Sequence, residues 1–369
     1  MYATQETPRA VRIHLTNITG AGTGAAQLAQ SLLPAIEACP GYRIEEIYLP
    51  GQGELANYRR RTDGVEPIRY RRFLPNSLSR LLECTLLGHR FDGAVPMLVL
   101  GDLPIRCSAR QVVFVQTPLL AVTGGVKQRA GALKYAIARL LFRFNCGFAA
   151  SFIVQTNTMQ HALERTYPRT RGSVHVIPQP APQWLLRAML KRRGRAAAHG
   201  AKLKLFYPAT FYPHKNHKIL SSIQQAGDWP VDILVLTIAC TQNPNPQLPW
   251  LQCVGALTPA QVLQHYESAD ALLFLSQSES YGFPLVEAMW IGLPIVCADL
   301  PYARTLCGAE AIYFQSNSAT SLRSAIDELH DRLSSGWWPD WTTRLKCIPK
   351  NWNDVASAML RLTAVTAAG

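Results

Sequence analysis

The sequence lacks the patterns that identify several classes of protein. Its nine cysteines are scattered, with no C-x-x-C pair and no paired spacing. We therefore expect reduced thiols, as in a cytosol, and neither a disulfide framework nor a zinc site. No apolar stretch of about 18 residues is free of charge, so no membrane-spanning helix is expected. The first ten residues, MYATQETPRA, do not show the basic and apolar regions of a secretory signal.

Metal-ligand patterns are missing as well. The chain contains no D-x-D motif and no cluster of His, Asp or Glu with the spacing of metal ligands. We therefore expect no bound metal. Any anionic ligand would have to be neutralised by cationic side chains and backbone N–H groups instead.

Acidic residues are scarce in the first half of the chain. Residues 1–200 hold 26 Lys and Arg but 11 Asp and Glu, whereas residues 201–369 hold 11 and 13. Because 369 residues exceed the usual size of one core, two domains are expected. A basic half implies an acidic partner, which would be nucleic acid, an anionic membrane surface or a phosphorylated substrate.

The most informative stretch begins with the apolar run Ala271–Leu275, which predicts a buried parallel strand. A polar loop follows, and then a short helix, Leu285–Ile291, with Pro284 at its start and Gly292 as its cap. The apolar run Leu293–Cys297 predicts a second strand. The stretch thus forms a strand, a loop, a helix and a strand.

Two carboxylates lie in this stretch. Glu279 is on the loop at the carboxyl end of the first strand, and Glu287 is about one turn inside the helix. Ligands of open α/β sheets bind at that edge, and a helix N-terminus beside it favours an anion. The spacing Glu279-x7-Glu287, with Gly-Phe-Pro between the acids, resembles the paired-glutamate motif of GT-B glycosyltransferases of the GT4 type, the group 1 family.

This resemblance implies an α/β fold of GT-B architecture, with two Rossmann-like, doubly wound domains facing each other across a cleft. The predicted N-terminal, acceptor-side domain spans residues 1–180. Residues 181–201, rich in proline and basic residues, form the predicted linker. Residues 202–351 form the predicted nucleotide-sugar domain, and a last helix at about 352–369 is expected to pack back on the first domain.

Lys215 is the predicted partner of the donor diphosphate. It follows the strand Leu203–Pro208 and comes just before a helix predicted from Ile219. A single ammonium at a helix N-terminus suits a phosphate, and the resemblance assigns a lysine there to the diphosphate. Many relatives also carry an arginine about five residues earlier, where this chain has Thr210.

A glycine-rich turn, Gly20–Gly24, follows the first predicted strand, Val11–Thr16. Such a turn lets the backbone approach a phosphate, and in the family this loop closes over the donor diphosphate and sugar. Gly22 and Gly24 are therefore predicted donor-binding residues. A dinucleotide-binding turn is a weaker interpretation, because the third glycine comes one residue early and no acid ends the second strand.

Two further donor contacts rest on the resemblance. Thr117 follows the strand Val112–Val115, near the position where many relatives use a histidine to reach the donor sugar. Gly255 lies near the expected position of the nucleobase. The resemblance gives Glu279 the hydroxyls of the donor sugar and Glu287 those of the ribose. The residues around the next helix start are also predicted to bind the donor, and the helix N–H groups after Gly282 are expected to help hold the diphosphate. These donor-binding residues are Gly282, Phe283, Pro284 and Leu285.

Two basic segments of the N-terminal half suggest an anionic surface as a partner. One is Arg59–Arg61 with Arg69–Leu74, which is either a solvated loop or a contact with lipid headgroups or a lipid-linked diphosphate. The other is the predicted amphipathic helix Ala132–Phe144. Five of its apolar residues are predicted to share one face: Leu133, Ile137, Leu140, Leu141 and Phe144. That helix either covers a sheet or lies on a membrane.

Together these features predict a retaining, metal-independent glycosyltransferase with Glu279 and Lys215 as catalytic residues. No cofactor is expected. The donor would be a UDP- or GDP-linked sugar, and the acceptor a polysaccharide or a polyprenyl-diphosphate-linked glycan in lipopolysaccharide or exopolysaccharide biosynthesis. We expect a cytoplasmic protein, peripheral on the inner membrane if the anionic surface is a partner, and no nucleic acid. The alternatives are a GT-B-like sugar-nucleotide epimerase or hydrolase and a non-catalytic RNA-binding or scaffold protein.

Overall fold

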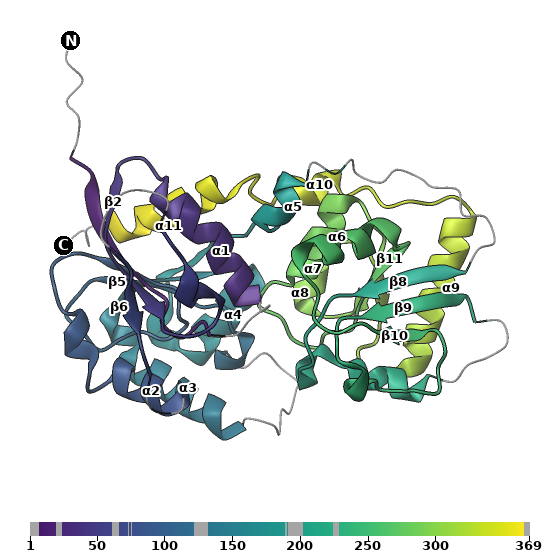
Figure 1. Ribbon diagram of the computed structural model, residues 1–369, viewed down its shortest axis with the longest axis horizontal. Helices are drawn as coiled ribbons and strands as arrows, with labels where there is room; N and C mark the ends of the chain where they lie inside the picture. Colours follow the sequence, from purple (N-terminus) through teal and green to yellow (C-terminus); the bar gives the residue numbers. More distant parts are fainter. Residues whose placement is uncertain are drawn as a thin grey trace, which may run out of the picture. The chain divides into compact units, whose positions relative to one another are not determined.

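The computed structural model describes most of the chain. The described residues are 7–19, 24–60, 66–72, 74, 76–121, 132–188, 190, 202–223 and 229–364. Those up to 179 and from 349 onward form unit 1, and those from 180 to 348 form unit 2. The boundaries predicted from the sequence are 180 and 351. Each unit is an α/β layer structure built on one sheet (Figure 1).

In the described part of unit 1, seven parallel strands form a sheet in the order β3-β2-β1-β4-β5-β6-β7. The strands are β1 (Arg9–His14), β2 (Tyr42–Pro50), β3 (Ile68–Tyr70), β4 (Met97–Val99), β5 (Gln111–Phe114), β6 (Ala149–Val154) and β7 (Val174–Val176). The central strands are buried along their length because helices cover both faces of the sheet (Figure 1).

The described α-helices of unit 1 are α1 (Gly24–Glu37), α2 (Asn76–Cys84), α3 (Ala132–Asn145), α4 (Asn157–Thr166) and α11 (Trp352–Ala364). Although α11 is last in the chain, it packs against α1 and against β4 and β5. Helix α1 runs through Pro34 without a break, although a proline at this position in a sequence favours one. The proline removes one hydrogen bond near the helix end, and the Ala38 N–H still donates to the Pro34 carbonyl.

In the described part of unit 2, six parallel strands form a sheet in the order β10-β9-β8-β11-β12-β13. They are β8 (Leu203–Tyr207), β9 (Val231–Leu236), β10 (Leu251–Cys253), β11 (Ala271–Phe274), β12 (Ile295–Ala298) and β13 (Ile312–Phe314). β11 pairs with β8 in the register Ala271 to Leu205 and Leu272 to Phe206. All four of these side chains are buried, so β8 and β11 form the centre of the core.

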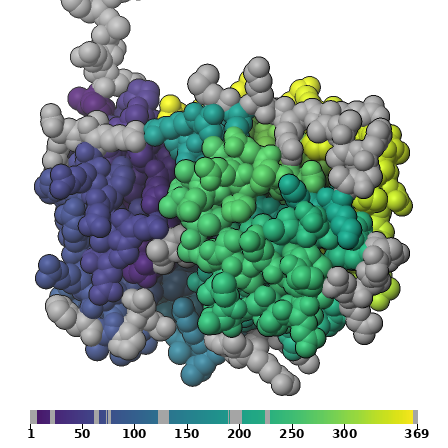
Figure 2. Space-filling model, turned by 45° about the vertical axis from the view of Figure 1, so that its right-hand side comes forward, coloured from purple at the N-terminus to yellow at the C-terminus, as the bar shows by residue number. Residues whose placement is uncertain are grey.

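The described α-helices of unit 2 are α5 (Gln183–Arg187), α6 (Pro259–Ser268), α7 (Phe283–Ile291), α8 (Pro301–Cys307), α9 (Ala319–Ser334) and α10 (Thr342–Lys346). Helix α5 lies inside the predicted linker. Ala181 and Leu185 are buried in the core of unit 2, so the start of that segment is packed protein. Residues 189 and 191–201 lie outside the described residues. The side of unit 2 that faces the reader in Figure 2 is largely teal and green.

Both sheets reverse the direction in which the chain adds strands. In unit 1 the chain proceeds outward from β1 to β3 and then returns to the other side of β1 with β4. In unit 2, β8 and β11 have the same relation. Ligands of doubly wound sheets bind outside the carboxyl ends of the strands at such a reversal. The segments after β8 and β11 are those in which the sequence predicts Lys215 and Glu279.

Candidate active site

The backbone around Lys215 is held from two sides. Lys215 ends a short 3₁₀ turn, Pro213–Lys215, after β8, and its backbone N–H donates to the Tyr212 carbonyl at 2.9 Å. The hydroxyl of Tyr207, the last residue of β8, donates to the Lys215 carbonyl at 2.7 Å. Tyr207 is fully buried. The position of Lys215 is therefore set by the core of unit 2 rather than by a free loop.

The segment after Lys215 differs from the prediction. Asn216 adopts a left-handed conformation with φ of 57°, and His217–Ser222 then form a 3₁₀ helix instead of an α-helix from Ile219. Residues 224–228 lie outside the described residues. A six-residue 3₁₀ helix has a small dipole, so Lys215 does not have the α-helix N-terminus that the sequence predicts beside it.

Lys215 and Glu279 meet at the reversal point of the unit 2 sheet. The Lys215 Nζ atom donates to Glu279 Oε1 at 2.5 Å. Their side chains are 17% and 13% exposed, so the pair is sheltered yet reachable from solvent. The same Nζ lies 5.9 Å from the ring centroid of Phe274, the last residue of β11. We call Lys215 and Glu279 the paired site.

Backbone contacts hold the two loops of the paired site together. The Gln277 N–H donates to the His214 carbonyl at 2.7 Å, and the Ser276 hydroxyl donates to the same carbonyl at 3.2 Å. Tyr302, on α8, donates through its hydroxyl to the Ser276 carbonyl at 2.5 Å. Nothing in the sequence indicates these contacts, because every acceptor is a main-chain carbonyl and carbonyls occur in all residue types.

Glu287 is more enclosed than a surface ligand contact would be. It lies inside α7, as predicted, with 4% of the residue exposed. Its Oε2 accepts a hydrogen bond from the hydroxyl of the buried Tyr266, on α6, at 2.7 Å. Burial raises the pKa of Glu287 to about 7, although the Tyr266 hydrogen bond acts in the opposite direction. At neutral pH this carboxyl therefore holds its proton much more readily than an exposed glutamate does.

The ends of α7 follow the sequence prediction closely. Gly282 precedes the helix with φ of 94°, and Gly292 follows it with φ of 84°. Positive φ angles of this size favour glycine at both positions. Pro284 lies in the first turn, where a missing N–H costs little. Leu285 is fully buried, and its N–H donates to the Gly282 carbonyl at 2.9 Å. Both the side chain and the N–H of Leu285 are therefore engaged within the protein.

Phe283 and Gly255 are the other predicted donor-binding residues of unit 2. The Phe283 ring is partly buried and packs edge to face on Tyr281, with centroids 5.5 Å apart. Gly255 has φ of 75°, and its N–H donates to the Ile238 carbonyl at 2.9 Å. A Cβ atom at Gly255 would meet nothing within 4 Å, so the backbone angle, not space, requires glycine there.

The predicted donor contacts of unit 1 are less well defined. Gly22 lies outside the described residues, and Gly24 is the first residue of α1. The Thr117 N–H donates to Asp102 Oδ1 at 3.0 Å, and the Gln116 N–H donates to the same oxygen at 2.6 Å. Asp102, which the sequence analysis missed, thus organises the segment after β5.

A second polar cluster lies at the reversal point of unit 1. Glu83 Oε1 accepts from His14 Nε2 at 2.8 Å and from the Thr16 hydroxyl at 2.5 Å. Glu83 Oε2 accepts from Arg72 Nη2 at 2.8 Å and lies 3.3 Å from Arg80 Nη1. The Glu83 side chain is 1% exposed. We call these five residues the buried network.

The protonation of the buried network follows from its charges. Burial alone would raise the pKa of Glu83, but Arg80 and the hydrogen bond from His14 outweigh it and hold that pKa well below its usual range. Burial lowers the pKa of His14 by more than Glu83 raises it, so the imidazole is neutral. The prediction of Arg72 as part of a solvated or lipid-facing loop is wrong, because its side chain is 8% exposed and bonded to Glu83.

Within the described ranges, no group of three or more His, Cys, Asp or Glu is placed to hold a metal ion. Likewise, no described helix is long and apolar enough to cross a membrane. The metal independence predicted from the sequence remains a prediction.

One segment of the chain is similar to a known protein family. Residues 251–332 match the family described as glycosyl transferases group 1. The serotype-specific mannosyltransferase WbdA of Escherichia coli is 28% identical over 138 residues, which are 35% of this chain and 17% of that protein. The chain thus matches about a sixth of the length of this curated relative.

Two solved structures extend the likeness to nearly the whole chain. WaaG, a glycosyltransferase of lipopolysaccharide biosynthesis, has a TM-score of 0.65 at 13% identity and covers 97% of this chain and 100% of its own. HepE of Anabaena, solved with UDP and glucose, has a TM-score of 0.61 at 13% identity and covers 97% and 100%. The predicted resemblance to group 1 glycosyltransferases and the predicted GT-B fold of two Rossmann-like domains are confirmed.

Proposed function

We propose that this chain, whose residues 251–332 match the group 1 glycosyl transferases, transfers a sugar from a nucleotide-sugar donor to a glycan acceptor. The observation that carries the proposal is the paired site, an ammonium and a carboxylate in contact at the reversal point of the unit 2 sheet. Glu279 belongs to the matched segment, whereas Lys215 comes from a loop outside it. Two loops far apart in sequence thus supply the two charges that a sugar diphosphate requires.

The proposed mechanism uses opposite charges for opposite ends of the donor. The Lys215 ammonium leaves Glu279 for the diphosphate and neutralises the charge that develops on it. The released Glu279 carboxylate accepts hydrogen bonds from hydroxyls of the donor sugar and orients it. We propose that Glu287 accepts from the ribose hydroxyls, which requires a shift of its bond with Tyr266.

The proposed transfer retains the anomeric configuration and uses no metal. The bond between the anomeric carbon and the phosphate oxygen breaks. The acceptor oxygen bonds to the same face of that carbon, and its proton goes to the departing phosphate. No described side chain of the paired site has to act as a covalent nucleophile in this scheme.

The names of the relatives support a proposal for the substrate class. WbdA is named as a mannosyltransferase, WaaG acts in lipopolysaccharide biosynthesis and HepE was solved with UDP and glucose. We propose a UDP- or GDP-linked donor and a polysaccharide or lipid-linked glycan acceptor. We propose that transfer takes place at the cytoplasmic side of a membrane, where nucleotide sugars are present. An epimerase or hydrolase would use the same donor but would give a product without a new glycosidic bond.

Donor binding is the first test. Thermal unfolding is followed with UDP-glucose, GDP-mannose and ADP-glucose, because a true donor must stabilise the folded protein. We expect one of these donors to raise the thermal midpoint of the natural chain. Lys215→Ala should reduce this rise, whereas Lys218→Ala, which changes an exposed lysine nearby, should preserve it. A rise unaffected by Lys215→Ala would remove Lys215 from the donor site.

Transfer is the second test, with the donor that binds and an extract of lipid-linked glycans as acceptor. We expect Glu279→Gln to lower kcat/KM by a factor of about 10²–10³, as loss of a preorganised polar contact does in other enzymes. Glu267→Gln, an exposed carboxylate on α6, is the matched control and should leave kcat/KM unchanged. Full transfer by both Glu279→Gln and Lys215→Ala would refute the assignment.

A further inference from the structure

Helix α3 has a buried apolar side and an apolar side that the described residues leave exposed. Phe142 and Leu141 are buried in the core of unit 1. Leu133, Ile137, Leu140 and Phe144, which share the side away from Phe142, are 75%, 39%, 55% and 67% exposed. The sequence analysis grouped Leu141 with these four, but the structure separates it from them. We call the four exposed residues the docking face.

The spacing of the docking face makes it a continuous stripe. Its residues recur at i, i+4, i+7 and i+11, which places them on one side of an α-helix over three turns. Large apolar side chains exposed singly are ordinary on a protein surface, but a contiguous set marks an interaction site.

Exposed apolar side chains also occur on segments next to α3 in space or in sequence. Helix α2 packs against α3, as the two labels side by side in Figure 1 indicate. On α2 and the segment after it, Leu78 is 44% exposed and Leu86 is 73% exposed. Phe148, just after α3, is 40% exposed. An amphipathic helix alone does not explain apolar side chains on all three segments.

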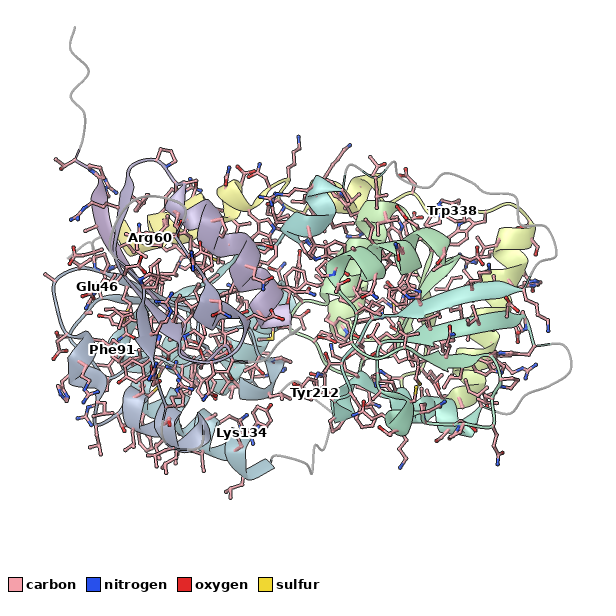
Figure 3. The ribbon with its side chains drawn as sticks, in the orientation of Figure 1. Glu46, Arg60, Phe91, Lys134, Tyr212 and Trp338 are labelled. Carbon is pink, nitrogen blue, oxygen red and sulfur yellow. The ribbon has the colours of Figure 1, made fainter. Side chains whose placement is uncertain are left out.

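The stretch of sequence that contains the docking face has basic residues but no acidic ones. Residues 103–163 contain no Asp or Glu but seven Lys and Arg. On α3 itself, Lys134 and Arg143 are exposed beside the docking face, and Lys134 is labelled in Figure 3 near the N-terminal end of that helix. Among the described residues of α3 there is no acid to pair with them.

We infer that the docking face binds an anionic lipid bilayer, with its four apolar side chains in the acyl boundary and the flanking cations at the headgroups. A basic helix with an apolar stripe binds in this way, in the plane of the interface. A second copy of the chain fits less well, because a symmetric interface would bring the same basic groups against each other. This inference concerns unit 1 alone and does not depend on the proposed transfer reaction.

Vesicle flotation tests the inference. The full chain is mixed with vesicles of pure phosphatidylcholine or with vesicles containing 30% phosphatidylglycerol, at low and high salt. We expect flotation with the anionic vesicles, at least tenfold weaker binding to the neutral ones, and partial release by salt because screening removes the charge component. Failure to bind anionic vesicles, or equal binding to both kinds, overturns it.

Variants separate the docking face from general stickiness. The double substitution Leu140→Ser and Phe144→Ser is expected to lower binding at least tenfold and, because both side chains are exposed, to leave the thermal midpoint unchanged. Arg9→Ser with Arg43→Ser removes two exposed charges on β1 and β2 of unit 1 and is the matched control for Lys134→Ser with Arg143→Ser. Equal loss of binding in both charge pairs would refute a specific face.

The state of association provides the last discrimination. Sedimentation velocity without lipid is expected to give a monomer for both the natural chain and the Leu140→Ser, Phe144→Ser variant. A dimer that the double substitution dissociates would assign the face to a second copy and overturn the inference. Because no sugar is present in these measurements, their outcome is independent of whether transfer is observed.

Discussion

The reversal point of each sheet holds a carboxylate that is paired with cationic side chains, but the two carboxylates differ in how far they are enclosed. In unit 1, Glu83 is 1% exposed and is surrounded by His14, Thr16, Arg72 and Arg80. In unit 2, Glu279 is 13% exposed and pairs with Lys215. Glu83 already accepts hydrogen bonds from His14, Thr16 and Arg72, so a ligand hydroxyl would have to compete with these internal donors. The comparison therefore favours a structural role for the buried network and agrees with the ligand role proposed for the paired site.

The first way to break this comparison is to remove the central carboxylate of unit 1. We expect Glu83→Ala to cost about 3–5 kcal/mol of unfolding free energy, because it leaves the Arg72 and Arg80 charges buried without compensation. Hydrogen exchange of the β1 and β4 amides measures the loss in unit 1, while β8 and β11 should keep their protection. Glu45→Ala, a surface carboxylate 3.7 Å from Arg43, should cost at most about 1 kcal/mol.

The second test uses pH, for which the two units are expected to behave oppositely. The pKa of Glu287 is raised from 4.5 to about 7 by burial, so its protonated form is favoured in the folded state. Stability from this group is fully present below pH 4.5 and is lost as pH rises through 7, by about 3 kcal/mol at 1.36 kcal/mol per unit. Glu287→Gln should remove that slope in unit 2 and stabilise it at pH 8; Glu267→Gln should not.

Unit 1 should show the reverse slope. The lowered pKa of His14 means that the unfolded state takes up its proton first, so stability falls as pH drops below 6.5. Glu83, whose pKa is also lowered, adds a further loss as pH falls below 4.5. Acidification from pH 7 to pH 5 should therefore weaken protection of β1 while strengthening that of β11. Parallel changes in both units would contradict the comparison.

The sequence indicated the positions of the charged groups in unit 2 better than those in unit 1, for a physical reason. Glu279 and Glu287 belong to one short strand–loop–helix stretch, so local spacing determines where both lie. The buried network instead joins residues 14, 16, 72, 80 and 83, and His14 and Glu83 are 69 positions apart. Only the strand order brings them together, and no local pattern indicates which of many arginines will be buried.

Local patterns also left open which side of an amphipathic helix is covered. The apolar residues of α3 occur on nearly every side, and periodicity does not tell a core side from a docking side. Burial separates Leu141 from Leu140 although they are neighbours in sequence. The caps of α7 were predictable because Gly282 and Gly292 meet a backbone requirement, a positive φ angle, that residue type alone reveals.

The third test compares stability with activity at the paired site. Lys215→Met should cost about 1–2 kcal/mol of unfolding free energy, the value of a hydrogen bond to a charged group, since the partly exposed Glu279 can be hydrated when its partner is lost. Transfer should fall by a factor of about 10² or more. Urea unfolding followed beside kcat/KM measures both. A stability loss as large as that of Glu83→Ala would place the pair with the buried network.

The smallest effect is expected for the hydrogen bond between Tyr266 and Glu287. Tyr266 donates to the buried Glu287 at 2.7 Å, so Tyr266→Phe removes one hydrogen bond and should cost about 1 kcal/mol. Because that bond opposes the raised pKa of Glu287, its loss should move the pH slope of unit 2 to higher pH. The exposed Tyr212→Phe is the control. An unshifted slope would mean that Tyr266 supports Glu287 by packing alone, so that burial by itself sets the protonation of this carboxyl.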